Sequence, residues 1–122
     1  MAPLHEARSF MLEYATTTNA AATPVASALL SLAATDVSWV HARVQATSST
    51  RALYENVLFC VRRNAGGLPT IHKKELDRYE PEGKTKWDLN LVAVSPDTVQ
   101  MAVTGESSTI VNWAIATRIV KS

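Results

Sequence analysis

Residues 87–119 read WDLNLVAVSPDTVQMAVTGESSTIVNWAIATRI, and this stretch decides the fold class. Apolar and polar side chains alternate along it, and a period of two indicates β-strands with one buried face. The alternation runs over residues 87–94, 99–104 and 111–119. Residues 95–98 (Ser-Pro-Asp-Thr) carry proline at the second position, which favours a β-turn. The stretch therefore predicts a three-stranded antiparallel meander with short turns.

Five upstream segments are also predicted to be strands, which brings the total to about eight. They are residues 9–14, 25–32, 37–47, 53–63 and 70–76. Segment 37–47 alternates most regularly, whereas segment 53–63 is apolar enough for burial on much of both faces. A helix over residues 50–59 is the alternative there, because Leu53, Val57 and Cys60 also lie at helical spacing.

Turns and loops separate these segments. Residues 64–69 (Asn-Ala-Gly-Gly-Leu-Pro) carry the strongest turn signal, and the chain should reverse direction there. Residues 15–24 are rich in Thr, Ala and Asn, which indicates a loop or an irregular edge. The pattern as a whole predicts an all-β fold, an antiparallel β-sandwich or jelly roll. We expect residues 1–14 to form an N-terminal arm or edge strand and residues 15–122 to form one sandwich domain.

The composition agrees with a single β domain. Val, Ile and Thr, which favour strands, account for 29 of the 122 residues. A chain of this size can bury a core without disulfides, and its lone cysteine, Cys60, is predicted to be a small buried hydrophobe. Twelve basic residues balance eleven acidic ones, which argues against nucleic-acid binding by bulk charge. No segment is apolar enough to suggest a transmembrane helix or a signal peptide, so we expect no membrane partner.

Charge is concentrated in one part of the chain, because ten of its charged residues fall between Lys73 and Asp88. The signs are mixed, so we expect a solvated loop that protrudes from the sandwich. Loops carry recognition on rigid β scaffolds, and this one is a candidate contact loop. Its candidate interaction residues are Lys73, Lys74, Arg78, Tyr79 and Glu80. Further candidates are three apolar residues of the arm and one tryptophan on a mixed strand face, namely Phe10, Met11, Leu12 and Trp39.

The sequence carries no recognisable catalytic motif, neither a phosphate-binding loop nor a nucleophile elbow. His5, His41 and His72 lie in three separate segments with no metal-ligand spacing. Glu80 and Glu82 could act as paired carboxylates, but in a charged loop they are expected to face water. We therefore predict no catalytic, cofactor-binding or metal-binding residue, and a small hydrolase or metalloenzyme is the least favoured alternative.

Three strings in the C-terminal third occur in a distinctive order. Residues 86–91 read KWDLNL, residues 99–105 read VQMAVTG and residues 109–115 read TIVNWAI. In this order they resemble a small β module of tailed-bacteriophage virion proteins, which closes with a Trp-Asp strand, a Val-x-Val-x-Val-Thr-Gly strand and an Asn-Trp-x-Ala strand. A looser similarity extends the match over residues 15–120.

The resemblance marks a structural signature whose residues also have physical readings. Trp87 and Trp113 lie on predicted inward faces and are expected to anchor the core. Gly105 can take a positive φ in a hairpin turn. Asp88 and Asn112 flank the tryptophans and can form hydrogen bonds at strand ends.

The resemblance implies a virion structural protein with no enzymatic activity and no cofactor. A chain that begins at Met1 and ends soon after its last strand is expected to be free-standing, which favours a capsid decoration protein on the head surface. The alternative is a tail or fibre component that acts as a receptor-binding module for the host. Expected partners are the major capsid protein or tail proteins, together with further copies in a homo-oligomer, for which a trimer is one option. The expected location is the virion, assembled in the host cytoplasm.

Overall fold

The computed structural model describes residues 7–31 and 37–121, with side chains described for residues 11–25, 31 and 37–120. It contains eight strands: β1 (Ala7–Thr17), β2 (Ala22–Ser31), β3 (Val37–Thr47), β4 (Ala52–Arg62), β5 (Thr70–Tyr79), β6 (Asp88–Ser95), β7 (Thr98–Thr104) and β8 (Val111–Lys121). No helix occurs in these two ranges. The all-β prediction is therefore confirmed, and the helix considered for residues 50–59 is wrong.

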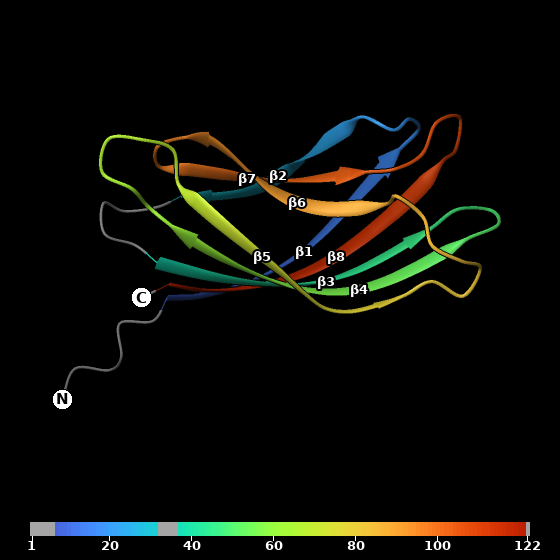
Figure 1. The fold of residues 1–122 in the computed structure, drawn as a ribbon, viewed down its shortest axis with the longest axis horizontal. Helices are drawn as coiled ribbons and strands as arrows, with labels where there is room; N and C mark the ends of the chain where they lie inside the picture. Colours follow the sequence, from blue (N-terminus) through green and yellow to red (C-terminus); the bar gives the residue numbers. More distant parts are fainter. Residues whose placement is uncertain (1–6, 32–36, 122) are drawn as a thin grey trace.

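The strands form two antiparallel sheets that stack face to face (Figure 1). The larger sheet has the order β1-β8-β3-β4-β5, and the smaller sheet has the order β2-β7-β6. β1 pairs with β8 and β2 pairs with β7, which is the nested pairing of a jelly roll. β4 and β5 depart from that scheme, since they extend the larger sheet as a meander. The predicted sandwich is confirmed.

β8 corrects the meander predicted for the C-terminal third. β6 and β7 form the expected hairpin, but β8 lies in the larger sheet between β1 and β3. Residues 105–110 carry the chain from one sheet to the other (Figure 1). Alternation shows which side chains of a strand face the core. Strands of both sheets have the same alternation, so it does not show to which sheet a strand belongs. For this reason the sequence pattern misplaced β8.

The core lies between the sheets and is filled by alternate residues of the strands. Trp87 and Trp113 lie within it, with ring centroids 6.3 Å apart, so their prediction as core anchors is confirmed. β4 has one fully buried face, whereas its other face is only half-buried because none of the described strands packs over it. Cys60 lies on that second face and is half-buried, which corrects its prediction as a fully buried residue.

β1 makes the N-terminal segment an edge strand of the larger sheet. It pairs with β8 over its whole length without a register shift and runs through residue 14, the predicted boundary of the arm. Met11 packs against the core and is partly buried, whereas Leu12 points away from it and is exposed. The side chain of Phe10 lies outside the described residues.

Two predicted loops are mostly strand. Of residues 15–24, only residues 18–21 lie between β1 and β2. Of the charged segment from Lys73 to Asp88, the first half belongs to β5 and Asp88 opens β6, which leaves residues 80–87 as the connection. The predicted charged loop is therefore correct for residues 80–87 only. Residues 73–79 form an edge strand, where charged side chains are common.

Candidate interaction site

Lys73 ties β5 to β6 across the open side of the sandwich. Its ammonium Nζ donates to Asp88 Oδ1 (2.7 Å), to the Leu89 carbonyl oxygen (2.8 Å) and to Asn90 Oδ1 (3.1 Å). The same ammonium lies 5.9 Å from the centroid of the Phe59 ring, within cation–π range. Lys73 thus joins the two sheets and donates a hydrogen bond to a backbone carbonyl of the edge strand β6.

Arg78 links β5 to β4 and to the connection that precedes β6. Its guanidinium donates to Glu80 Oε2 (2.9 Å), to Glu55 Oε2 (3.2 Å) and to the Trp87 carbonyl oxygen (2.7 Å). Burial opposes the charged form of Glu80, but hydrogen bonds from Arg78 and Thr85 outweigh it and lower the pKa of this carboxyl. The Glu80 side chain is 6% exposed, so the prediction that it faces water is wrong.

Glu55 brings a carboxylate into the core, where the residue is 1% exposed. Its Oε2 accepts from Arg78, while its Oε1 makes no hydrogen bond within the part of the chain that the structure describes. Desolvation by burial raises the pKa of Glu55, and attraction to Lys73 and Arg78 offsets part of that effect. Protonation of Glu55 is therefore linked to folding.

A β-bulge explains why Lys73 and Arg78 point to the same side. The pairing of β5 with β4 shifts between Asn56 and Val57, so that Leu76 has no partner on β4. One extra residue reverses the alternation, and it brings an odd-numbered and an even-numbered side chain to one face. The sequence pattern alone does not reveal this shift.

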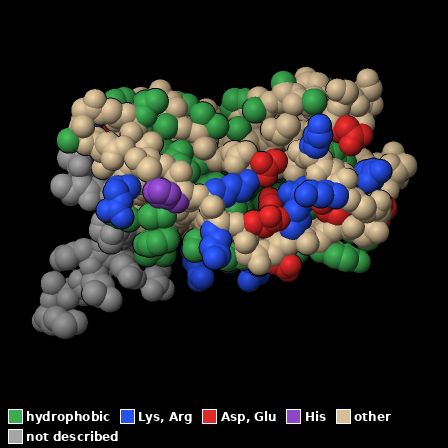
Figure 2. All heavy atoms as spheres, in the orientation of Figure 1, with side chains coloured by type: hydrophobic (Ala, Val, Ile, Leu, Met, Phe, Trp, Pro, Cys, Tyr) green, Lys and Arg blue, Asp and Glu red, His purple; other side chains and the backbone are tan. Residues whose placement is uncertain are grey.

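These contacts change the part played by the charged segment. Figure 2 shows basic and acidic side chains gathered along one side of the sandwich, where β5 lies beside β6. Lys73 and Arg78 lie on β5, Glu80 lies in the connection that follows it, and all three are engaged within the chain. Lys74 and Tyr79 are exposed, and the register pairs them with the outward residues of β4. They remain candidate contact residues.

The outward side chains of the larger sheet form a surface that we call the outer face. The register places four large exposed side chains on it: Leu12 and Tyr14 of β1, Trp39 of β3 and Tyr79 of β5. They are 59%, 71%, 46% and 63% exposed, respectively. Aromatic side chains are enriched at protein interfaces, so an uncovered sheet face of this kind is a candidate docking surface. The sequence analysis did not name Tyr14 as a candidate, although Tyr14 lies two residues after Leu12 and therefore on the same face of β1.

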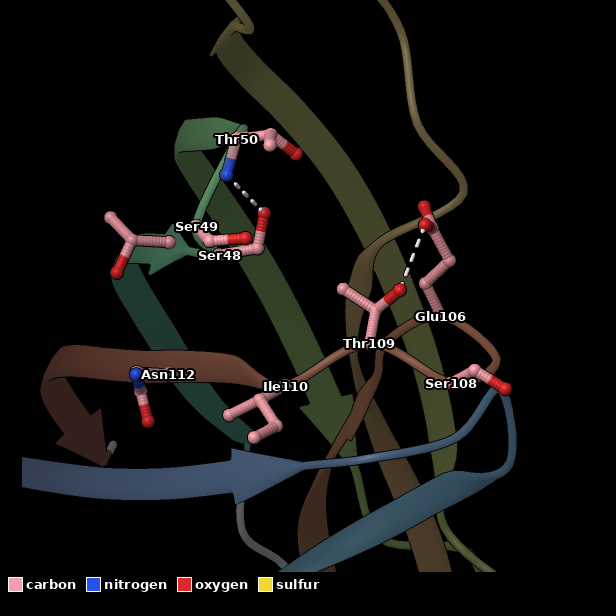
Figure 3. Close-up of a pocket in the computed structure, with 9 residues that line it drawn as sticks. Ser48, Ser49, Thr50, Glu106, Ser108, Thr109, Ile110 and Asn112 are labelled. Atoms are coloured by element: carbon pink, nitrogen blue, oxygen red, sulfur yellow. Dashed lines mark hydrogen bonds between the residues drawn. The ribbon is translucent and has the colours of Figure 1, made fainter.

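A separate hollow of about 610 Å³ lies at the end of the sandwich where the β3–β4 and β7–β8 connections meet. Figure 3 shows the residues that line it. Its lining is mostly hydroxyl and amide groups: Thr47, Ser48, Ser49, Thr50, Glu106, Ser108, Thr109, Ile110 and Asn112. Ser48 Oγ accepts from the backbone nitrogens of Thr50 (3.3 Å) and Arg51 (3.0 Å). Thr109 Oγ1 donates to Glu106 Oε2 (3.2 Å). These groups stabilise their own loops.

Gly105 allows the backbone to pass close to Thr17, and its φ is not positive. Among the described residues of that connection, Ser108 takes the left-handed conformation, with φ at 54°. A Cβ atom on Gly105 would overlap Thr17 Oγ1 and lie 3.3 Å from the Asn19 carbonyl oxygen. The predicted reason for this glycine is therefore wrong, and steric crowding at Thr17 replaces it.

Asp88 and Asn112 form the strand-end hydrogen bonds expected of them. Asp88 Oδ1 accepts from the Leu89 backbone nitrogen (3.0 Å), and its Oδ2 accepts from Asn90 Nδ2 (2.9 Å). Asn112 Oδ1 accepts from Thr16 Oγ1 (3.1 Å). Both residues thus order strand ends.

Neither a metal site, nor a membrane-spanning helix, nor a known relative was found for the described part of this chain. Within residues 7–31 and 37–121, no three His, Cys, Asp or Glu side chains lie close enough to hold a metal ion together. The same ranges contain no helix with the length and apolar character needed to span a membrane. No protein-family model matches the sequence, and no curated protein matches it. Function is therefore inferred from the surfaces of the sandwich.

Proposed function

We propose that the protein is a structural component of a bacteriophage virion, namely a capsid decoration protein that attaches to the head through the outer face. The resemblance of residues 86–115 to virion modules supports the class of protein. The mode of attachment is carried by one observation, the exposure of Leu12, Tyr14, Trp39 and Tyr79 on a single uncovered sheet.

Attachment through this face has a plain energetic basis. Each Å² of apolar surface removed from water contributes about 25 cal/mol, and aromatic side chains offer the largest areas. When copies on a regular shell also associate with one another, each copy binds the shell at a high effective concentration. Weak individual contacts are then sufficient for stable attachment. The proposed partners are the major capsid protein and further copies of the chain.

A receptor-binding module of a tail or fibre is the second candidate. The observation that favours it is the hollow at the loop end, because loops on a rigid sandwich are the usual place for recognition. In that arrangement the loops 48–51 and 105–110 would face the host, and the outer face would attach to the tail.

Labelling of virions with an antibody against the protein separates the candidates by electron microscopy. Label spread over the head supports a decoration protein, and label confined to the tail tip supports a receptor-binding module. Virions that carry no label would overturn both.

Substitution in the outer face tests the attachment surface directly. We expect Tyr14→Ser combined with Leu12→Ser to reduce the number of copies on purified particles, because both side chains lose buried apolar area there. Val92→Ser/Val94→Ser is the matched control, since these two side chains are 45% and 51% exposed on β6 of the other sheet. Deletion of residues 1–12 is a poorer test, because it removes half of β1. Equal attachment of all variants would contradict docking through the outer face.

A further inference from the structure

A second hollow, of about 250 Å³, lies in the outer face between β3 and β8. It is lined by His41 and Arg43 of β3 and by Ala116 and Arg118 of β8. The register pairs His41 with Arg118 and Arg43 with Ala116, so the two arginines lie diagonally across the strands. Diagonal neighbours on a sheet are about 7–8 Å apart, a spacing that long side chains span. Because Ala116 has only a methyl group, both guanidinium groups can reach one bound group above it.

The guanidinium groups of this hollow are not engaged elsewhere. Arg43 and Arg118 are exposed, and within the described ranges neither makes a hydrogen bond or an ion pair. Arg51 and Arg78 differ, because their guanidinium groups donate to oxygens of the chain. Like charges are destabilising when they lie directly opposite on paired strands, and the diagonal placement of these two arginines avoids that arrangement. Both guanidinium groups therefore stay available to a bound anion.

His41 is held in place beside the arginines. Its Nε2 lies 2.7 Å from Asn56 Oδ1, and Asn56 Nδ2 in turn donates to the Tyr54 hydroxyl at 3.4 Å. The contact with Tyr54 orients the Asn56 amide so that its oxygen accepts from Nε2–H of the imidazole. The ring therefore forms a fixed wall of the hollow.

The surrounding face has the charge of a surface that meets an acidic partner. Its described charged side chains are Arg43, Arg62, Lys74 and Arg118 against Asp77. The chain as a whole is nearly neutral, so this excess of positive charge is local to the outer face. Leu12 pairs with Ala116 at the border of the hollow, which adds apolar contact area there. Complementary charge of this kind selects partners and fixes their orientation.

We propose that Arg43 and Arg118 clamp a carboxylate side chain of an acidic partner protein over Ala116. This inference rests on the proposed function, because it names the chemistry of the partner that docks on the outer face. Guanidinium groups bind carboxylates through paired, charge-assisted hydrogen bonds, which makes arginine the preferred residue for such sites. A protein is favoured over a nucleic acid, because binding to a phosphate backbone relies on many cations and the described outer face carries only four, together with Asp77.

Titration of the whole protein with a blocked tetraglutamate peptide, followed by NMR, tests the clamp. We expect the backbone amide signals of His41, Arg43, Ala116 and Arg118 to shift. The double variant Arg43→Gln/Arg118→Gln should weaken binding about tenfold or more, since hydrogen bonds to charged groups are lost. Arg62→Gln/Lys74→Gln is the matched control, because it removes two positive charges from the same face outside the hollow, and it should bind nearly as the wild type. Equal weakening by this control, or shifts located elsewhere, would overturn the clamp in favour of bulk charge.

Attachment to particles distinguishes failure of the clamp from failure of the proposed function. If the arginine variant attaches like the wild type while Leu12→Ser/Tyr14→Ser does not, the clamp is wrong and docking through the outer face stands. If neither variant changes attachment, docking through this face is wrong as well. Tighter binding of a DNA duplex than of the peptide at 0.15 M salt would show that the hollow serves phosphate, and it would overturn the protein partner.

Discussion

The indole nitrogen of Trp113 donates a buried hydrogen bond to Thr17 Oγ1, and the two atoms are 3.0 Å apart. The bond connects the start of β8 to the end of β1, next to the point where the chain crosses between the sheets. Thr17 is 2% exposed, so water cannot replace it as the acceptor. Trp113 belongs to the structural signature that the resemblance marked. Its indole hydrogen bond depends on Thr17, which the sequence analysis did not single out.

Thr17→Val should destabilise the protein by about 1–3 kcal/mol, because it keeps the side-chain shape and leaves the indole N–H without a buried acceptor. Chemical denaturation measures the loss. Thr16→Val is the control, since the Thr16 hydroxyl bonds Asn112 at an exposed position and its loss should cost within about 0.5 kcal/mol. Equal costs for the two variants would contradict a special role of the buried bond.

Gly105→Ala should destabilise the protein by about 1–3 kcal/mol, because the added methyl group collides with Thr17 Oγ1 and forces the crossing loop to move. The measurement is the midpoint of urea unfolding at constant slope. Gly67→Ala provides the comparison, since a Cβ there meets nothing within 4 Å and the backbone is not in the left-handed region. A stable Gly105→Ala variant would mean that the loop relaxes freely around the methyl group.

Lys73→Met should cost about 1.5–3 kcal/mol, because hydrogen bonds to a charged group are lost and Asp88 keeps an uncompensated charge. The loss also frees the Leu89 carbonyl on the edge strand β6, so we expect greater aggregation on heating. Lys74→Met changes the same charge on the neighbouring residue, which is exposed on the outer face, and should change stability by no more than about 0.5 kcal/mol. Thermal unfolding with light scattering measures both effects, and similar behaviour of the two variants would argue against the link between the sheets.

Alternation predicted most strands because each needs one apolar face towards the core. The pattern of β3, in which Val40, Ala42, Val44 and Ala46 are all buried, is the clearest case. The strand predicted for residues 70–76 is confirmed, but its continuation to Tyr79 was missed because the inward side chains Lys73 and Arg78 are charged and find partners across the sheets. Partners on another strand are fixed by register, which a single sequence does not display.

The candidate site was predicted only in part for the same reason. Leu12, Trp39 and Tyr79 were singled out individually, and the register of three non-consecutive strands brings them to one face. The diagonal arrangement of Arg43 and Arg118 needs the pairing of β3 with β8, which joins residues far apart in sequence. A misplaced β8 therefore hid this hollow from the sequence pattern.

Glu55 and Glu80 should give stability opposite dependences on pH. The pKa of Glu55 is raised, so its protonated form favours the folded state. The stability it contributes is complete below the ordinary value of 4.5 and is lost as the pH rises through the raised pKa. The pKa of Glu80 is lowered, so its contribution is present above 4.5 and is lost as the pH falls through the lowered pKa.

Thermal unfolding of Glu55→Gln and Glu80→Gln between pH 3 and pH 8 separates the two groups. Relative to the wild type, we expect Glu55→Gln to gain stability as the pH rises above about 4.5, because the variant never carries a desolvated charge. Glu80→Gln should be less stable than the wild type at neutral pH, and this deficit should shrink in acid. A Glu55→Gln variant whose stability relative to the wild type stays constant or falls as the pH rises would show that Arg78 and Lys73 fully compensate the buried carboxylate.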